Sequence, residues 1–346
     1  MRRKIKTALP DNLKENNLFL FHNRDTYYTS DLKIKSHKNV FITHEGLCLK
    51  NMRLLPKSHF NIMGNADRTF YYQFWKLAVE QYLVSTFGKS LKKINLDKNT
   101  YLAIHTKWFG YFFWLTDALP KLIKTKGLHK EVELIYPENW DAIPFVADTL
   151  KLFPDLKTKR IESGVHLQVE KLILPETRQW SNAIDPAEIS LVRDFLFEKL
   201  EEKKVLKNYG TRIFISRKKA ARRKITNNVE VENLLDSHGF KSVCLEDYTF
   251  LEQVSIMKHA KYVIGLHGAG LANILFMKKE GHVVELSPTI INKKNLRIPF
   301  WRLANAIDGR FSILFCDIES TNTNEPYDMD LKVQIMDLEK IMHDFK

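Results

Sequence analysis

The sequence predicts an α/β protein whose C-terminal half is a Rossmann-like domain built on a parallel sheet. From Asp185 onward, short apolar segments alternate with amphipathic helical segments, which is typical of βαβ units. The apolar segment Tyr262–Leu266 runs directly into a small-residue turn and a further helical pattern. Because βαβ connections are right-handed, such a chain folds into a parallel sheet with helices on both faces.

Capping residues and periodicity define the elements of this half. Asp185 before Pro186 is a helix start, and the periodic segment continues to about residue 204. Asn227 is placed to cap a helix at 229–237, and Thr249 with Glu252 forms a capping box for a helix that ends near residue 259. We expect strands at 212–216, 241–245, 262–266, 282–286 and 311–316.

The first half of the chain is aromatic-rich and less regular. Strand-like segments lie at 40–43, 101–105, 132–136 and 171–174, and helical patterns lie at 69–87 and 111–124. We therefore divide the chain into an α/β domain at 1–183, a Rossmann-like domain at 184–328 and a C-terminal segment at 329–346. Asp337 is the expected cap of a last helix, which we expect to pack back on the first domain.

Composition narrows the class of protein. With 346 residues, 44% of them hydrophobic, the chain can fill two cores. No segment approaches the roughly 20 apolar residues of a membrane span, and no apolar signal-peptide core follows the basic start. Cys48, Cys244 and Cys316 are widely spaced, which favours a reducing cytosol over a disulfide framework or zinc site. We expect a cytoplasmic protein. Its net charge of +13 favours anionic partners: nucleotides, anionic lipid or nucleic acid.

The turn from His267 to Gly270 is the most informative segment. Free backbone N–H groups and a helix N-terminus favour an anion there, phosphate above all. Gly268 and Gly270 lack a Cβ, so a ligand could approach the main chain closely. The alternative is a plain turn between a strand and a helix.

A basic segment and an acidic residue follow other strands of the same predicted sheet. Six of the eight residues from 217 to 224 are basic, and they begin where the strand at 212–216 ends. Arg217 and its neighbours could clamp a diphosphate, because charge-assisted hydrogen bonds contribute roughly 1.5–3 kcal/mol each. Glu285 could bind a ribose diol. The alternatives are a solvated loop and an ion-paired glutamate.

These segments together resemble glycosyltransferase family 61. The likeness rests on 214–217, 222–227, 249–254, 260–277 and 283–286, and on the helical segment 111–121. It covers about residues 100–290, and the segment around His267 is its most specific part. In the family pattern a histidine usually stands where this chain has Phe113, so no role for that histidine can be carried over. Lys121 replaces the usual arginine.

The resemblance implies a GT-B architecture, with two Rossmann-like domains facing a cleft, and an inverting transfer. The first domain would be the acceptor side and the second the donor side. Asp117 is the candidate catalytic base, with a capping or salt-bridged aspartate as its alternative, and His267 is a second candidate. The expected donor-binding residues are Arg217, Arg222, Arg223, Asn227, His267, Gly268, Ala269, Gly270, Leu271, Asn273 and Glu285.

We expect no metal and no other cofactor. Asp328 and Asp330 form a D-x-D sequence of the kind that metal-dependent glycosyltransferases use, but it lies in a polar segment near the C-terminus. The helix N-terminus at His267 and the arginines could stabilise a departing diphosphate without a metal ion.

The expected partners are a nucleotide-sugar donor and a glycan or lipid-linked glycan acceptor for capsular polysaccharide or lipopolysaccharide. A hexosyl- or pentosyltransferase would fit, with peripheral contact to an anionic membrane surface. Two alternatives stay open: a basic protein that binds nucleic acid or nucleotides, and an inactive relative of the family. We expect no nucleic-acid partner because no known binding motif is present.

Overall fold

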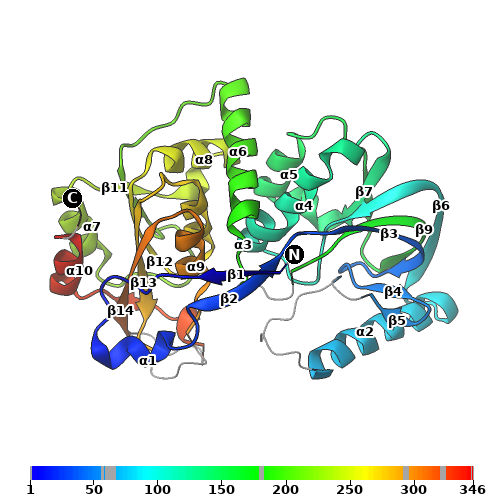
Figure 1. Ribbon diagram of the computed structural model, residues 1–346, viewed down its shortest axis with the longest axis horizontal. Coiled ribbons are helices and arrows are strands. Elements are labelled where there is room, and N and C mark those ends of the chain that lie inside the picture. Colours follow the sequence, from blue (N-terminus) through cyan, green and yellow to red (C-terminus); the bar gives the residue numbers. More distant parts are fainter. Residues whose placement is uncertain are drawn as a thin grey trace. The chain divides into compact units, whose positions relative to one another are not determined.

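The computed structural model describes residues 2–55, 58, 68–178, 183–290, 296–319, 325–343 and 345. The chain forms two compact units (Figure 1). Unit 1 comprises Met1–Arg3 and Thr29–Ala183, and unit 2 comprises Lys4–Tyr28 and Ile184–Lys346. Within the described part of the chain, no helix is long and apolar enough to cross a membrane.

Unit 2 contains the predicted parallel sheet. Its six strands have the order β11-β10-β12-β13-β14-β15, and only the short edge strand β15 is antiparallel to its neighbour. The α/β class and the parallel sheet of the C-terminal half are therefore confirmed. The strands are β10 (Arg212–Ile215), β11 (Lys241–Val243), β12 (Tyr262–Leu266), β13 (His282–Pro288), β14 (Arg310–Ile318) and β15 (Leu331–Lys332).

Helices cover both faces of this sheet. Alternate strand residues, among them Phe214, Ile264 and Val284, share one core cluster with α7 and α10. A Cβ at Gly265 would lie 3.1 Å from Leu271 of η6, so η6 covers the opposite face. The helical elements are α6 (Pro186–Glu202), α7 (Asn228–Ser237), η5 (Leu245–Asp247), α8 (Phe250–His259), the 3₁₀ segment η6 (Ala269–Phe276), α9 (Pro299–Ala306), η8 (Pro326–Asp328) and α10 (Ile335–Met342).

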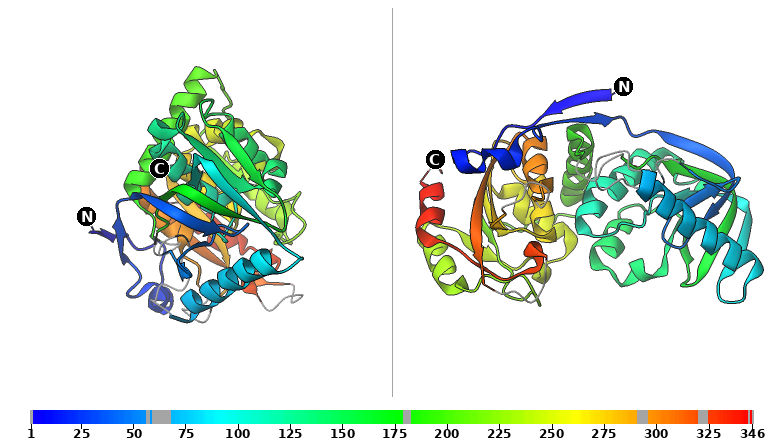
Figure 2. Two further views of the ribbon diagram at one scale, coloured as in Figure 1. Left: turned by 90° about the vertical axis from the view of Figure 1, so that its right-hand side faces the viewer. Right: turned by 90° about the horizontal axis from the view of Figure 1, so that it is seen from below.

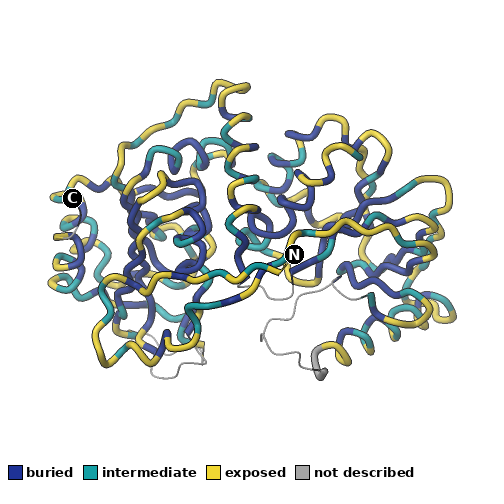
Figure 3. Tube along the Cα trace, viewed as in Figure 1, coloured by how far each residue is buried: buried dark blue, intermediate teal, exposed yellow. Residues whose placement is uncertain are grey.

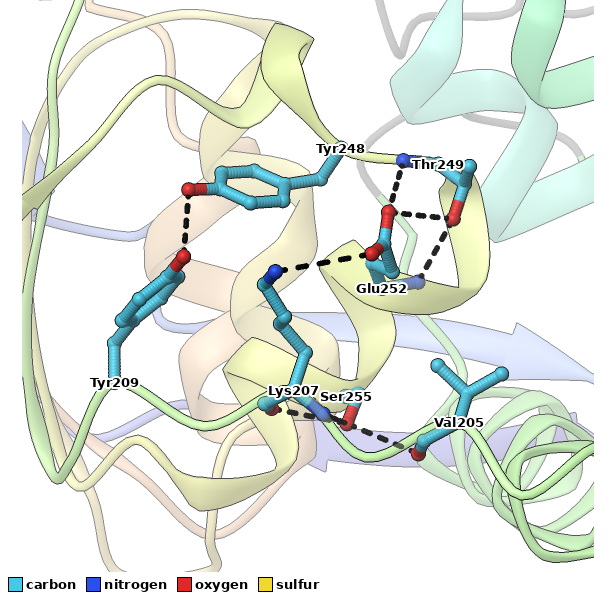
Figure 4. A network of polar contacts seen from close by, with 7 residues as sticks. All are labelled: Val205, Lys207, Tyr209, Tyr248, Thr249, Glu252 and Ser255. Atoms are coloured by element: carbon cyan, nitrogen blue, oxygen red, sulfur yellow. Dashed lines mark hydrogen bonds and ion pairs between the residues drawn. The ribbon is translucent and has the colours of Figure 1, made fainter.

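Two of the predicted helix caps form, and two do not. The Asp185 side chain accepts a hydrogen bond from the Ala187 N–H, and the Thr249–Glu252 capping box is complete (Figure 4). Ser255, on the same helix, bonds the main chain of Val205 and Lys207, so it fastens the connection between α6 and β10. Asn227 makes no cap hydrogen bond, and α10 begins before Asp337, with Gln334 at its N-cap.

Both ends of the chain pack into unit 2. Leu338, Ile341, Met342 and Phe345 join the core beside β10, β12 and β13, where we had expected this segment to return to the first domain. At the other end, we had placed residues 4–28 in the first domain, but Lys4–Tyr28 belongs to unit 2 (Figure 2). This segment contains α1 (Leu18–Phe21), and β1 (Arg2–Lys6) pairs with β2 (Thr26–Ser30).

The N-terminal segment is held by contacts that local patterning does not reveal. Asn12 exchanges two hydrogen bonds with the main chain of Ile313, at 2.8 and 3.0 Å. The Trp301 indole N–H donates to the Ala8 carbonyl at 2.6 Å. Phe21 lies edge-on to Trp301, with 5.0 Å between ring centroids. Leu20 and Phe21 are thus buried, with distant residues as their packing partners, whereas Leu18 and Phe19 are exposed.

Unit 1 is built on a seven-stranded mixed sheet of order β5-β4-β3-β9-β6-β7-β8. Strands β9, β6, β7 and β8 are parallel, and β3 runs antiparallel to β9. The central strands β12 and β13 of unit 2 are buried throughout, whereas β3 and β6 of unit 1 are buried only towards their C-terminal ends (Figure 3). The strands of unit 1 are β3 (Ile34–Ile42), β4 (Cys48–Lys50), β5 (Arg53–Leu54), β6 (Lys92–Ala103), β7 (Val132–Pro137), β8 (Thr158–Ile161) and β9 (Val165–Pro175).

The predicted helix at 111–124 forms, with an irregular middle. It consists of α3 (Tyr111–Phe113), a π-helical turn (Trp114–Ala118) and α4 (Leu119–Lys124). Such π turns are rare in proteins, and many of those that occur are at functional sites. The remaining helical elements of unit 1 are α2 (Arg68–Phe87), η3 (Lys126–Leu128), η4 (Glu138–Ala142) and α5 (Pro144–Leu150).

Gly46 provides a test of the packing in unit 1. Its φ is +86°, and a Cβ there would lie 2.4 Å from the His105 carbonyl oxygen. We expect Gly46→Ala to lower the free energy of unfolding by about 1–3 kcal/mol, because backbone strain and a main-chain clash add. Gly127→Ala is the control, since nothing lies within 4 Å of its Cβ position. Equal urea midpoints for the two variants would contradict this packing.

Candidate functional site

The topology of unit 2 marks a binding position between β10 and β12. The chain leaves β10 through α7 towards β11, and it leaves β12 through η6 in the opposite direction towards β13. Ligands of open α/β sheets bind at the carboxyl ends of the strands where the connections diverge in this way. Arg217 follows β10, and His267 follows β12 directly, so both belong to this edge.

Arg217 joins the two loops at this edge. Its Nε donates to the Arg223 carbonyl at 3.1 Å, and one terminal nitrogen donates to the Arg222 carbonyl at 3.2 Å. Its Nη1 lies 3.0 Å from the position that a Cβ on Gly268 would occupy. Gly268 has an extended backbone, which any residue can adopt. Glycine is favoured here because a Cβ would crowd the Arg217 guanidinium.

The other residues of the glycine turn have different surroundings. Ala269 is exposed, whereas Leu271 is buried against Gly265. A Cβ on Gly270 would lie 3.4 Å from Ile215, so this glycine serves packing as well. Asn273 is fully buried, and its side chain donates to the Gly270 carbonyl at 3.1 Å. Leu271 therefore packs beneath the turn on Gly265, and Asn273 holds the turn by its hydrogen bond to Gly270.

The basic segment is fastened to the C-terminal part of unit 2, although Lys218, Lys219, Arg222 and Lys224 are exposed to solvent. Asp328 lies 3.3 Å from Arg222 and 3.9 Å from Arg223. Asp330 accepts a hydrogen bond from the Lys224 N–H at 2.7 Å. The D-x-D aspartates thus hold the arginine segment. In the ranges that the structure covers, no group of three or more His, Cys, Asp or Glu residues could hold a metal ion.

Positive charge is concentrated at this edge. Burial lowers the pKa of Arg223, and the charges of Arg217, Arg222 and Arg297 lower it further, against the opposing charge of Asp328. Burial also lowers the pKa of Arg217, again with a contribution from Arg222. An anion bound among these guanidinium groups would relieve their mutual repulsion.

Glu285 is the partner of His267. The carboxylate accepts from His267 Nδ1 at 2.5 Å, and both side chains are buried. Glu285 lies inside β13, opposite Gly265, and not at the strand end. The expected ribose contact stays a prediction beside this pair. The arrangement fixes the orientation of the imidazole and directs Nε2 away from the carboxylate.

Two residues that sequence reasoning missed complete the surroundings of His267. The Tyr327 ring lies 4.3 Å from the imidazole and carries the Arg297 guanidinium at 4.7 Å on its face. Burial and the charge of Glu285 raise the pKa of Tyr327 to about 12. Tyr327 directly precedes Asp328, which is the one local signal that could have pointed to it.

Asn227 makes structural hydrogen bonds. Its side chain donates to the Val333 carbonyl at 2.9 Å and accepts from the Val333 N–H at 3.0 Å. The amide thus joins the start of α7 to the segment before α10. The expected donor contact of Asn227 stays a prediction beside this structural role.

Asp117 lies in unit 1, in the π-helical turn. Its Oδ2 accepts from Lys121 Nζ at 2.6 Å, and both side chains are almost completely buried. Lys121 also donates to Thr177 Oγ1 at 2.7 Å and to the Ile104 carbonyl at 3.4 Å. Asp117 is thus salt-bridged, which was the alternative interpretation. It also lines a pocket with His105, which the sequence analysis did not select.

His105 is the most perturbed titratable group of this pocket. Burial lowers its pKa to about 3, and the nearby charges of His44 and Lys121 add to this effect. The imidazole is therefore neutral at physiological pH. A neutral imidazole offers one hydrogen-bond donor and one acceptor.

The fold defines an α/β protein whose C-terminal parallel sheet has a cationic edge. The model of the Glycosyltransferase 61 family matches residues 111–284, half of the chain, and the chain belongs to this family. It is accordingly of the glycosyltransferase class. The matched region begins with the helix that carries Asp117 and includes Arg217 and the His267 turn. No curated protein matches the chain.

The buried ion pair can be tested by stability. Lys121→Met leaves the Asp117 carboxylate buried without its counter-charge, and we expect a loss of about 3–5 kcal/mol in the free energy of unfolding. Adding Asp117→Leu should restore most of the loss, because an apolar pair of similar size avoids the charge. Urea unfolding of the single and double variants measures this. A double variant no more stable than Lys121→Met would contradict the pairing.

Asn227 offers a second test, of structural against ligand-binding roles. Asn227→Ala leaves the N–H and carbonyl of buried Val333 without partners, and we expect a loss of about 1–3 kcal/mol in unfolding free energy. Val229→Ala, at an exposed position of the same helix, is the control and should stay within about 0.5 kcal/mol of the parent chain. Unchanged stability with weakened nucleotide binding would restore the predicted donor role.

Proposed function

We propose that this chain transfers a sugar from a nucleotide-sugar donor to a glycan acceptor, and that unit 2 binds the donor. The observation that carries the proposal is the convergence of Arg217, Arg222 and Arg223 with the Gly268 turn at the point where the sheet connections diverge. Nucleotide diphosphates are anionic, and this edge concentrates cationic groups, with the Arg217 guanidinium against Gly268.

The chemistry of transfer requires stabilisation of the departing diphosphate. The acceptor oxygen bonds to the anomeric carbon, the bond from that carbon to the diphosphate oxygen breaks, and the acceptor proton passes to a base. Guanidinium groups held in place before the reaction stabilise the developing charge without reorganising. The proposed mechanism therefore uses Arg217, Arg222 and Arg223 in place of a metal ion.

His267 is proposed to contact the diphosphate. With Glu285 accepting from Nδ1, the carboxylate balances an imidazolium, whose Nε2–H can then donate to a phosphate oxygen. In the neutral form the same nitrogen accepts a proton, so His267 is also the second candidate for the base. Asp117 is the proposed base for the acceptor hydroxyl, and its ion pair with Lys121 holds the carboxylate in place.

The finer assignments stay predictions of the family resemblance. They are the GT-B arrangement, inversion at the anomeric carbon, and transfer of a hexose or pentose. They also include an acceptor in capsular polysaccharide or lipopolysaccharide, and a cytoplasmic location with peripheral contact to an anionic membrane. The net charge of +13 fits the last of these.

A panel of UDP-, GDP-, CMP- and dTDP-linked sugars tests the donor site by thermal shift in EDTA. Near 100 times Kd, a ligand stabilises the fold by roughly 2.7 kcal/mol. We expect one nucleotide class to raise Tm for the parent chain and for Lys218→Ala, whose exposed side chain lies next in sequence. Arg217→Ala should lose the shift.

Other outcomes would contradict the proposal. Stabilisation by polynucleotides and by no nucleotide sugar would favour a basic nucleic-acid-binding protein. Binding that requires a divalent ion would overturn the metal-free clamp. Nucleotide-sugar binding without hydrolysis of the donor or transfer to any acceptor would mark an inactive relative.

A further inference from the structure

The long helix α2 is apolar on the side that faces solvent as well as on the side that faces the sheet. It packs on the sheet of unit 1 through a stripe that contains Phe74 and Ala78 (Figure 1). The outer side of a surface helix is ordinarily polar. In α2, however, Leu83, Val84 and Phe87 are 44%, 36% and 81% exposed. The fold of unit 1 does not require apolar residues at these positions.

These three side chains form one patch at the C-terminal end of α2. Residues three and four apart are neighbours on a helix surface, so Leu83 and Val84 both adjoin Phe87. Phe87 is the last residue of the helix, where the Gly88 N–H donates to the Val84 carbonyl at 2.8 Å. Among the described aromatic side chains, that of Phe87 is the most exposed. We call Leu83, Val84 and Phe87 the apolar tip.

Lysines follow the apolar tip directly in the chain. Residues 81–96 contain Lys89, Lys92 and Lys93 but neither aspartate nor glutamate. Lys93 is held against the helix, because its Nζ donates to Thr86 Oγ1 at 3.0 Å. Lys89 and Lys92 are exposed, and neither forms a salt bridge with a described residue. Positive charge is therefore available beside the apolar tip.

Charge and size decide which partner fits this surface. At the boundary of an anionic bilayer, apolar side chains enter the acyl region while lysines contact the phosphate groups. A second protein chain fits less well, because a stable interface takes about 800 Å² from each partner. Three partly exposed side chains provide only on the order of 300 Å². A soluble polyanion would use the lysines but leave the apolar tip in water.

We propose that the apolar tip, with Lys89 and Lys92, is the surface by which unit 1 contacts an anionic lipid bilayer. Phe87 enters the layer between the headgroups and the acyl chains, and the two lysines bind lipid phosphates. The inference rests on the proposed function for its setting, since a peripheral membrane contact is part of that proposal. It gives the contact a place on the chain and requires no step of sugar transfer.

The test is co-sedimentation of the full chain with phosphatidylcholine vesicles that contain or lack phosphatidylglycerol. We expect binding only to the anionic vesicles, with release at high salt. Phe87→Ser should weaken binding about tenfold or more, because an aromatic ring no longer leaves water. Phe87→Trp should retain binding, since tryptophan is favoured at the membrane interface. Lys89→Gln combined with Lys92→Gln should weaken binding about twentyfold, because each lysine near an anionic leaflet contributes roughly fivefold.

Matched controls lie on unit 2. Leu206→Ser removes an apolar side chain that is 90% exposed. Lys203→Gln combined with Lys204→Gln removes two exposed charges. Both controls should bind anionic vesicles like the parent chain. The changed side chains of all these variants are exposed, so their urea midpoints should equal that of the parent chain.

Three results would overturn the surface: no binding to anionic vesicles, equal losses in the tip variants and the controls, or binding that neither Phe87→Ser nor the lysine pair weakens. A dimer in light scattering that Phe87→Ser dissociates, without vesicle binding, would assign the apolar tip to a second copy of the chain. Vesicle binding is measured without nucleotide. It can therefore hold when no nucleotide sugar raises Tm, and the donor site can hold when the membrane surface fails.

Discussion

The guanidinium of Arg217 is the group on which the cationic edge of unit 2 depends. It donates to the carbonyls of Arg222 and Arg223 and lies against Gly268, so one side chain joins loops that are about fifty residues apart in sequence. The topology makes this possible, because β10 and β12 are adjacent and their connections leave in opposite directions. A Cβ at position 268 would force the guanidinium to shift.

The edge of unit 2 keeps positive charge that the folded chain does not fully neutralise. Burial lowers the pKa values of Arg217 and Arg223, and neighbouring guanidinium groups lower them further, so these charges are held at a cost to the folded chain. Such local destabilisation is typical of binding sites, where the ligand supplies the missing partner. A ligand of opposite charge suits this edge.

Each unit also contains one buried acid paired with a basic group: Glu285 with His267, and Asp117 with Lys121. A buried ion pair adds little net stability compared with an apolar pair of the same size, because both charges lose hydration. Its effect is to fix orientation. Glu285 determines which imidazole nitrogen can meet a ligand, and Lys121 holds the carboxylate of Asp117 beside the aromatic pocket. Asp117 lies in a π-helical turn, an irregularity of the helix that often occurs at functional sites.

The sequence by itself determined the features that depend on neighbouring residues. The strand before His267, the basic segment after β10, the capping box at Thr249 and the parallel sheet all follow from local patterning, because periodicity and caps act within a few residues. Only the tertiary structure decided which distant groups meet. It paired Glu285 with His267, Asn227 with Val333 and Asp328 with the arginines, and it brought His105 to Asp117. It also packed Phe21 against Trp301 in unit 2. These contacts join residues far apart along the chain, and no local preference encodes the partner of a side chain whose hydrogen-bonding capacity several groups could satisfy.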